Sequence, residues 1–199
     1  ASITDDENAR NNATVSEEDK EYTYSIKTKD KDYVTIGFAG DILFDDNYAV
    51  GEAFKRHGDS VKGVFGKRLL SKMKNVDIML VNNEFPYSLG GAPTPNKTYT
   101  FRARPETAKI LGEMGVDMVT LANNHVYDFG KDAFLDMLDA LEEYKIPHIG
   151  AGRNIEEAKK PYYFIINGYK FSFVTASRAE KYRLTPGATE DSEGIFLCY

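Results

Sequence analysis

Cysteine and histidine are scarce in this sequence. The 199 residues include one cysteine, Cys198, and three histidines. A single cysteine excludes a disulfide within the chain and any metal site built from cysteine thiolates.

Long apolar runs are absent as well. No stretch of the sequence is long and apolar enough to cross a membrane, and no signal peptide is visible. The chain opens with Ala1 and stops at Tyr199, just after an apolar run. We therefore expect a piece of a longer protein, with further sequence on both sides.

Positive charge is in deficit. The chain has 25 Lys and Arg against 31 Asp and Glu, which gives a formal net charge of −6. Nucleic-acid binding needs clustered Lys and Arg, so the composition argues against a nucleic-acid partner. An acidic surface also repels polyanions at long range, although a bound cation inverts that effect locally. The hydrophobic fraction of 42% is sufficient for a core.

Two regions differ in composition. Residues 1–31 are rich in Asp, Glu, Asn, Ser and Lys and contain little that could be buried. Such a segment cannot offset its ordering entropy, so we expect a disordered lead-in or linker. The folded domain is expected over residues 32–199.

Strand and helix patterns alternate through the folded region. β-branched and aromatic runs predict strands, and apolar residues at helical spacing predict helices. Alternation of this kind is typical of an α/β fold with a largely parallel sheet. Asn167-Gly168 lies between two apolar runs and predicts a hairpin, so the last two strands should be antiparallel. The expected strands are residues 33–38, 76–81, 118–121, 148–149, 162–166 and 171–175, and the expected helices are residues 60–74, 105–114 and 131–144.

Three polar clusters follow the ends of predicted strands. Because the carboxyl ends of parallel strands meet at one edge of a sheet, these clusters should converge. Their oxygen donors and one imidazole suit a divalent metal such as Mn, Mg, Fe or Zn. The clusters are Gly40-Asp41, then Asn82-Asn83-Glu84, then Asn123-Asn124-His125 with Asp128.

Each of these features also has a purely structural interpretation. Gly40-Asp41 and Asn82-Asn83 are common turn formers, and Asn124 could cap a following helix. Arg102 and Arg104 could clamp an anionic substrate, or could simply be exposed on a surface strand. Of the other two histidines, His57 is expected to be solvated. His148 is expected to be a core or edge residue.

Several motifs resemble those of the CapA family, the bacterial capsule and poly-γ-glutamate synthesis proteins. They are Phe101-Arg102-Ala103 with Pro105-Glu106, Leu121-Ala122-Asn123-Asn124-His125 with Asp128 and Gly130, and Gly150-Ala151-Gly152. The resemblance covers the chain from about Val34 onward. It implies a metallophosphoesterase-like four-layer αββα sandwich, of which this chain is the N-terminal part. It also implies an extracytoplasmic protein, with a membrane anchor in the full-length protein.

The resemblance further implies roles for individual residues. Asp41, Glu84 and Asn124 match metal ligands of the phosphoesterase pattern, and His125 matches its general acid. Arg102, with Asn123 and Asp128, would contact an anionic polymer or phosphoester substrate. A dinuclear metal site would polarise the phosphoryl group and lower the pKa of an attacking water.

The sequence departs from the phosphoesterase pattern at three points. Leu43 stands where a histidine is usual, and Glu84 stands where an aspartate is usual. The histidines that the family supplies in a second half lie beyond this chain. As given, the chain should be inactive, and its missing half or another copy of the chain should cover exposed apolar surface.

Two functions from different classes remain open. One is a metal-dependent hydrolase of phosphoryl or amide bonds in capsule or cell-wall polymer metabolism, favoured by Glu84, Asn124 and His125. The other is a non-catalytic extracellular scaffold or polymer-binding protein that retains the fold, favoured by Leu43.

Overall fold

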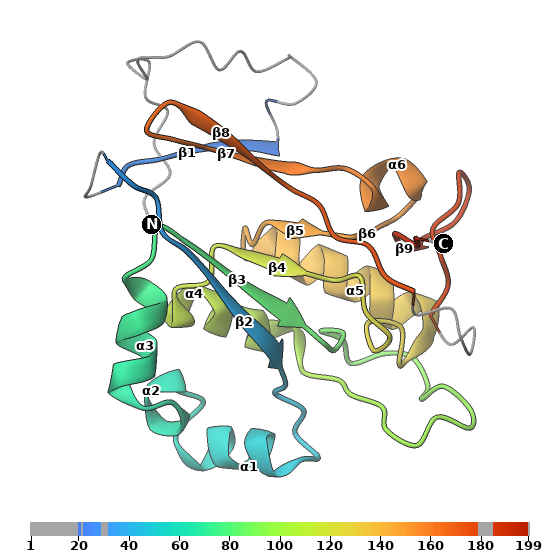
Figure 1. The fold of residues 1–199 in the computed structure, drawn as a ribbon. Helices are drawn as coiled ribbons and strands as arrows, with labels where there is room; N and C mark the ends of the chain where they lie inside the picture. Colours follow the sequence, from blue (N-terminus) through green and yellow to red (C-terminus); the bar gives the residue numbers. More distant parts are fainter. Residues whose placement is uncertain (1–19, 21, 29–31, 179–184, 199) are drawn as a thin grey trace.

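A computed structural model describes residues 20, 22–28, 32–178 and 185–198. They form three layers, which are a set of helices, a four-stranded sheet and a three-stranded sheet (Figure 1). The expected α/β class with a parallel sheet is confirmed, and the layers make up the αββ part of a four-layer αββα sandwich. No helix of the described residues is long and apolar enough to cross a membrane.

The central sheet is wholly parallel. Its order is β2 (Ile36–Ile42), β3 (Ile78–Asn83), β4 (Met118–Thr120) and β5 (His148–Ile149). The first four residues of β3 are buried apolar residues, as expected for a strand covered on both faces. The strand turns polar only at its carboxyl end, and this change places polar side chains at one edge of the sheet.

The second sheet combines β1 (Thr23–Ile26), β7 (Tyr162–Ile166) and β8 (Tyr169–Phe173). The predicted hairpin is confirmed, because β7 and β8 are antiparallel and Asn167 and Gly168 have φ values of 52° and 80°. Positive φ at both central residues is the geometry of a type I′ turn, which matches the twist of the two strands.

Strand β1 corrects the expected extent of the lead-in. Residues 23–26 were assigned to a disordered segment, but they pair with β7 in a parallel ladder. Ile26 is buried in that ladder, so a short apolar alternation within polar sequence was enough to form an edge strand. The other residues of the expected lead-in, 1–19, 21 and 29–31, lie outside the described residues.

One predicted helix is divided in two. The expected helix over residues 60–74 is interrupted at Phe65 and Gly66, which both have extended backbone angles. The helix expected over residues 105–114 begins with a 3₁₀ turn and ends at Gly115, which adopts the left-handed conformation. The helices are α1 (Ala49–Arg56), α2 (Val61–Val64), α3 (Lys67–Lys74), the 3₁₀ helix η2 (Pro105–Ala108), α4 (Lys109–Met114), α5 (Gly130–Glu143) and α6 (Ile155–Ala158). Strands β6 (Ala151–Gly152) and β9 (Gly194–Ile195) pair as a separate two-stranded antiparallel sheet.

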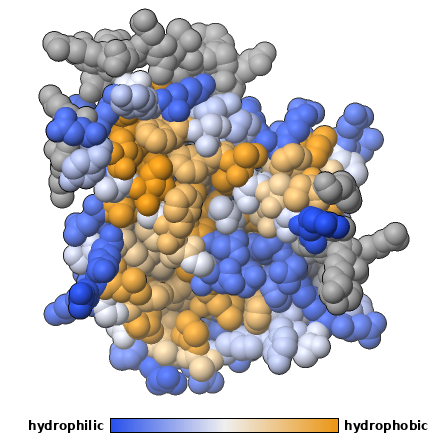
Figure 2. All heavy atoms as spheres, viewed as in Figure 1, coloured by the Kyte–Doolittle hydropathy of each residue, from blue (hydrophilic) through white to orange (hydrophobic). Residues whose placement is uncertain are grey.

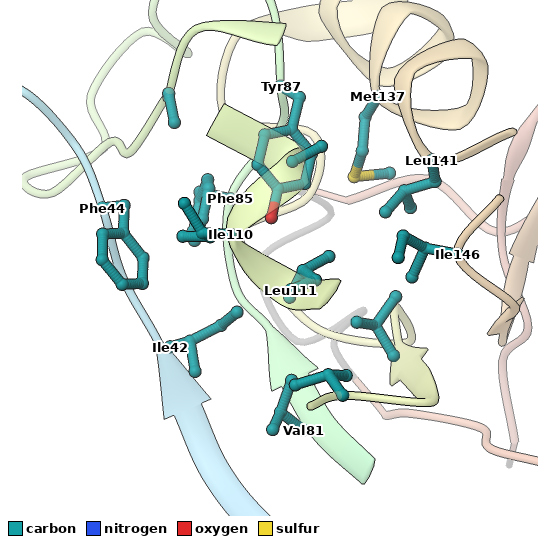
Figure 3. Packing of buried hydrophobic residues seen from close by; sticks show 14 of the residues in the cluster. Ile42, Phe44, Val81, Phe85, Tyr87, Ile110, Leu111, Met137, Leu141 and Ile146 are labelled. Atoms are coloured by element: carbon teal, nitrogen blue, oxygen red, sulfur yellow. The ribbon is translucent and has the colours of Figure 1, made fainter. Parts of the chain in front are cut away.

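Two apolar cores hold the layers together. The larger lies between the helices and the central sheet, where Phe85, Ile110, Leu111 and Met137 are fully or almost fully buried (Figure 3). The Tyr87 hydroxyl reaches into this core and donates to Asn83 Oδ1 at 2.7 Å. The smaller core lies between the two sheets and contains Ile26, Ile78, Leu80, Met118, Ile149, Phe164 and Ile166.

The side of the molecule at β2 and β8 exposes apolar surface. Figure 2 shows hydrophobic residues gathered over these two strands. Phe38 on β2 is 71% exposed, and Val174, just after β8, is 59% exposed. Each of the two strands is the last of its sheet within the described residues. Coverage of this side by a missing half or a second copy stays a prediction.

Candidate functional site

The polar clusters predicted from the sequence meet at the carboxyl edge of the central sheet. In the parallel register, Asp41 at the end of β2 lies opposite Asn82 of β3, which lies opposite Thr120 of β4. A hydrophilic patch covers the region where β2 and β3 end (Figure 2). The expected convergence of the strand ends is therefore confirmed.

Asn82 connects three strand ends through its side-chain amide. Its Nδ2 donates to Asp41 Oδ1 at 2.7 Å. Its Oδ1 accepts from Thr120 Oγ1 at 3.0 Å and from Asn123 Nδ2 at 3.1 Å. An amide can donate and accept at the same time, so one residue fixes the relative positions of the three clusters.

Asn123 shapes the turn that presents the histidine. Its Oδ1 accepts from the backbone N–H groups of His125, at 3.0 Å, and Val126, at 3.2 Å. Its Nδ2 also donates to the Asn83 carbonyl at 2.9 Å. The residue is 7% exposed and its amide atoms are all engaged, so the structure shows it positioning the loop. Its predicted contact with substrate stays a prediction.

His125 is oriented by a buried carboxylate. Its Nδ1 lies 2.8 Å from Asp128 Oδ2, and Asp128 is completely buried. An ionised carboxylate only accepts hydrogen bonds, so Nδ1 carries the proton that is shared with Asp128. The other ring nitrogen, Nε2, makes no hydrogen bond to the described residues and remains available to a ligand.

Asp128 is itself held by two further groups. Its Oδ1 pairs with the Lys97 ammonium, whose side chain is only 8% exposed and which also donates to the Asn124 carbonyl. Its Oδ2 accepts from the Phe101 backbone N–H at 2.7 Å. Buried charges are tolerated where they are paired and hydrogen-bonded, as they are here.

Phe101 covers the face of the histidine. The two ring centroids are 4.5 Å apart and the ring planes are inclined by 35°. A second buried carboxylate, Asp45, accepts from the next backbone N–H, that of Arg102, at 2.6 Å. Asp45 and Asp128 thus hold two consecutive peptide groups and fix the loop segment that carries Phe101.

Glu84 and Asp41 form the other side of the site. Their carboxyl groups are close enough to share a hydrogen bond, and Glu84 also interacts with the charge of His125. Burial, followed by the charge of Asp41, raises the pKa of Glu84 above its usual value. Two neighbouring carboxyl groups are stabilised by a shared proton or by a bound cation.

Asp41, Glu84 and Asn124 are the residues of this site that could hold a cation. Asp41 and Glu84 offer adjacent carboxylate oxygens, and the exposed side chain of Asn124 makes no hydrogen bond to the described residues. However, no group of three or more His, Cys, Asp or Glu residues positioned for a metal occurs in the described part of the chain. Leu43 packs against the larger core and cannot contribute a ligand.

Arg102 is engaged within the protein. Its Nη1 donates to the Gly90 carbonyl at 2.8 Å, and its guanidinium lies 4.2 Å from the centre of the Phe129 ring. Arg104 forms ion pairs with Asp46, Asp59 and Glu106. The contacts of both arginines connect segments of the protein to each other. The role of Arg102 in substrate binding stays a prediction.

Three residues around the histidine were missed by sequence reasoning. Asp45, Lys97 and Phe101 lie in loops and were not assigned to the site. Phe101 stands within a motif that was noticed for its arginines. The sequence signal for Asp45 is its position directly after the apolar residues Ile42, Leu43 and Phe44. A carboxylate buried beside such residues needs a hydrogen-bond partner.

The comparisons with known proteins concern the family of the chain. The sequence model of the family described as "Bacterial capsule synthesis protein PGA_cap" matches residues 35–194. The match spans all three strand ends and the turn that carries His125.

Two relatives come from bacilli. The chain is 29% identical to a capsule biosynthesis protein CapA of Bacillus anthracis over 182 residues, which cover 86% of this chain and 43% of that protein. It is 25% identical to a PGA biosynthesis protein CapA of Bacillus subtilis over 189 residues, which cover 89% of this chain and 47% of that protein. The chain spans about half the length of these curated relatives.

Proposed function

Because the chain belongs to the bacterial capsule synthesis family PGA_cap, we propose that it acts in poly-γ-glutamate capsule metabolism as part of a hydrolytic domain. The bond cleaved is a phosphoryl or an amide bond of an anionic polymer or its precursor. The domain works outside the cytoplasm, anchored to the membrane in the full-length protein. The observation that supports hydrolysis is the Asp128-bound His125 beside the Asp41–Glu84 pair.

His125 is suited to transfer a proton to the leaving group. Asp128 fixes the ring through Nδ1, and Nε2 makes no hydrogen bond to the described residues. When Nε2 is protonated, it donates that proton to the leaving oxygen or nitrogen as its bond to phosphorus or carbon breaks. A water oxygen forms the new bond to the same phosphorus or carbon atom. Proton transfer by a positioned side chain contributes about 10²–10⁴-fold to a rate.

The Asp41–Glu84 pair is suited to a divalent cation. Asp41 and Glu84 would hold it through carboxylate oxygens, with Asn124 as a third ligand. Such a cation would polarise the bond that is attacked and lower the pKa of a bound water. Phe101 shields one face of the imidazole from water, which keeps the proton-transfer group in a single orientation.

A non-catalytic scaffold is the second candidate. It is favoured by Leu43, which takes the place of an expected ligand in the core, and by the lack of a three-residue ligand cluster among the described residues. A scaffold would keep the fold and the polar strand ends for binding the polymer without cleaving it.

Cation binding tests one half of the proposal. We expect this chain to bind one Mn²⁺ weakly, as measured from the electron paramagnetic resonance signal of free Mn²⁺. Glu84→Gln should weaken binding by about tenfold or more. Glu113→Gln, an exposed change on α4, should leave binding unchanged. Equal binding by both variants would contradict the cation site.

Hydrolysis tests the other half. A chromogenic phosphodiester and γ-linked polyglutamate should be assayed with Mn²⁺, using this chain and a protein of the full length of the relatives. We expect this chain to be inactive and the longer protein to lose turnover in His125→Ala but not in His57→Ala. Turnover that survives His125→Ala would refute the acid role. No turnover in a longer protein that binds Mn²⁺ would favour the scaffold.

A further inference from the structure

Helix α3 carries a concentrated positive charge in an acidic protein. Residues 60–76 contain five Lys or Arg and no Asp or Glu, so this segment has a charge of +5. The whole chain has a net charge of −6, which leaves −11 on all other residues. A charge separation of this size orients a molecule in the field of an anionic partner.

The basic side chains occupy the solvent face of the helix. At about 100° per residue, Leu70 and Met73 point to one side, and Arg68 and Lys72 fall on the opposite arc. Lys67 and Lys74 flank the buried side, about 70–90° from its centre. Leu70 and Met73 are buried, whereas the basic residues are exposed and form no ion pair within the described part of the chain. We call the exposed basic side chains of this segment the α3 basic face, and its members are Lys67, Arg68, Lys72 and Lys74 on α3 together with Lys62 on the preceding helix α2.

The charges in the first turn of α3 work against the stability of the helix, whereas Lys72 and Lys74 in its last turn are favourably placed. Lys67 and Arg68 stand in its first turn, where the helix dipole is positive and no acidic residue is present. Gly66 provides no side-chain cap. In contrast, α1 has Glu52 in its first turn and basic residues in its last turn, which is the favourable order. The arrangement of α3 is therefore better explained by an external anion than by helix stability.

An exposed leucine selects the kind of partner. Leu69 is 47% exposed on α3, between the buried stripe and the basic arc. A soluble polyanion would gain nothing from this side chain. A lipid surface would gain from it, because basic side chains pair with anionic headgroups while a leucine enters the acyl boundary.

We propose that the α3 basic face docks this domain on a membrane surface that contains anionic lipid. Helix α3 leads into the amino end of β3, and the candidate site lies at the carboxyl end of the same strand (Figure 1). Docking through α3 therefore turns the candidate site away from the lipid surface and toward the polymer. The outer surface along α3 is hydrophilic at the edge of the view in Figure 2.

Vesicle sedimentation tests this docking. The chain should bind vesicles with about one third phosphatidylglycerol, bind phosphatidylcholine vesicles far less, and release as salt is raised. A charge near an anionic surface contributes roughly fivefold to binding, so Lys67→Glu/Arg68→Glu should lower partitioning by well over tenfold. The matched control Lys145→Glu/Lys159→Glu makes the same change in net charge at exposed positions elsewhere and should bind nearly as the parent does.

A second variant separates lipid from a soluble polyanion. Leu69→Asn should weaken vesicle binding severalfold and leave any binding to soluble polyglutamate unchanged. Thermal unfolding by circular dichroism checks that each variant is folded. The proposal is overturned if the two charge variants bind vesicles equally. It is also overturned if polyglutamate, rather than the vesicles, is the ligand that responds to Lys67→Glu/Arg68→Glu.

Discussion

The two sides of the candidate site differ in how their polar groups are partnered. On the histidine side, Asn123 and Asp128 are buried and each of their side-chain polar atoms is hydrogen-bonded or ion-paired. On the carboxylate side, Asp41 is exposed and Glu84 is half-buried, and the two meet as like charges. The contacts on the first side hold His125 in one orientation. The carboxyl groups on the second side remain available to a ligand.

Because of this difference, neighbouring residues of the site should contribute to different properties, either to the stability of the fold or to ligand binding. A fully satisfied buried network is costly to break, because each lost partner leaves another group unsatisfied. In an exposed pair of like charges, a change that removes one charge relieves the repulsion and stabilises the folded protein. Substitutions on the histidine side should therefore mainly lower the free energy of unfolding, while those on the carboxylate side should mainly alter binding.

The largest loss of stability is expected at Asp128. Asp128→Asn removes the charge that neutralises the Lys97 ammonium, which is 8% exposed. Breaking a buried ion pair by changing one partner lowers the free energy of unfolding by about 3–5 kcal/mol. Urea unfolding followed by circular dichroism measures the change.

A surface ion pair provides the matched control for Asp128. Asp139→Asn removes a carboxylate that is 69% exposed and pairs with Arg153, and it should lower stability by about 1 kcal/mol or less. The double change Lys97→Met/Asp128→Asn should recover part of the loss, because no unpaired ammonium remains. A loss below about 1 kcal/mol in Asp128→Asn would show that the network is not needed for the fold.

The next largest difference in the free energy of unfolding is expected between substitutions of two adjacent asparagines, Asn123 and Asn124. Asn123→Ala leaves the backbone N–H groups of His125 and Val126 without their acceptor, and should cost about 2–3 kcal/mol. Asn124→Ala changes an exposed side chain and should cost less than about 0.5 kcal/mol. Chemical denaturation of the two variants measures the difference. Equal losses would mean that the turn does not depend on the Asn123 amide.

The strand ends could be predicted from sequence because they follow a simple rule. Apolar runs that turn polar mark the carboxyl ends of β2, β3 and β4, and parallel pairing brings those ends to one edge. The hairpin at Asn167-Gly168 could be predicted for a similar reason, since its turn chemistry is local.

The supporting contacts could not be predicted, because they depend on chain segments that are far apart. Lys97 reaches Asp128 across 31 positions, and Asp45 holds the Arg102 backbone across 57 positions. Among the described residues, strand β1 forms its ladder with β7, more than a hundred residues later. No local pattern of residues 86–104 indicates which buried acid they will meet.

The smallest effect is expected outside the site, at the second partly buried histidine. His148 lies on β5, its Nδ1 is 3.2 Å from the Ile146 carbonyl, and burial lowers the pKa of its ring below the usual value. A lowered pKa means that the unfolded chain binds a proton more readily than the folded protein. His148 therefore does not oppose folding above the unfolded pKa of about 6.5, and it costs stability as the pH falls below that value. Urea midpoints between pH 7.5 and pH 5 should show this slope for the parent protein, a shallower slope for His148→Gln, and the parent slope for His57→Gln at an exposed position. An unchanged slope in His148→Gln would assign the acid sensitivity to other groups, and the carboxylates of the site would be the first to examine.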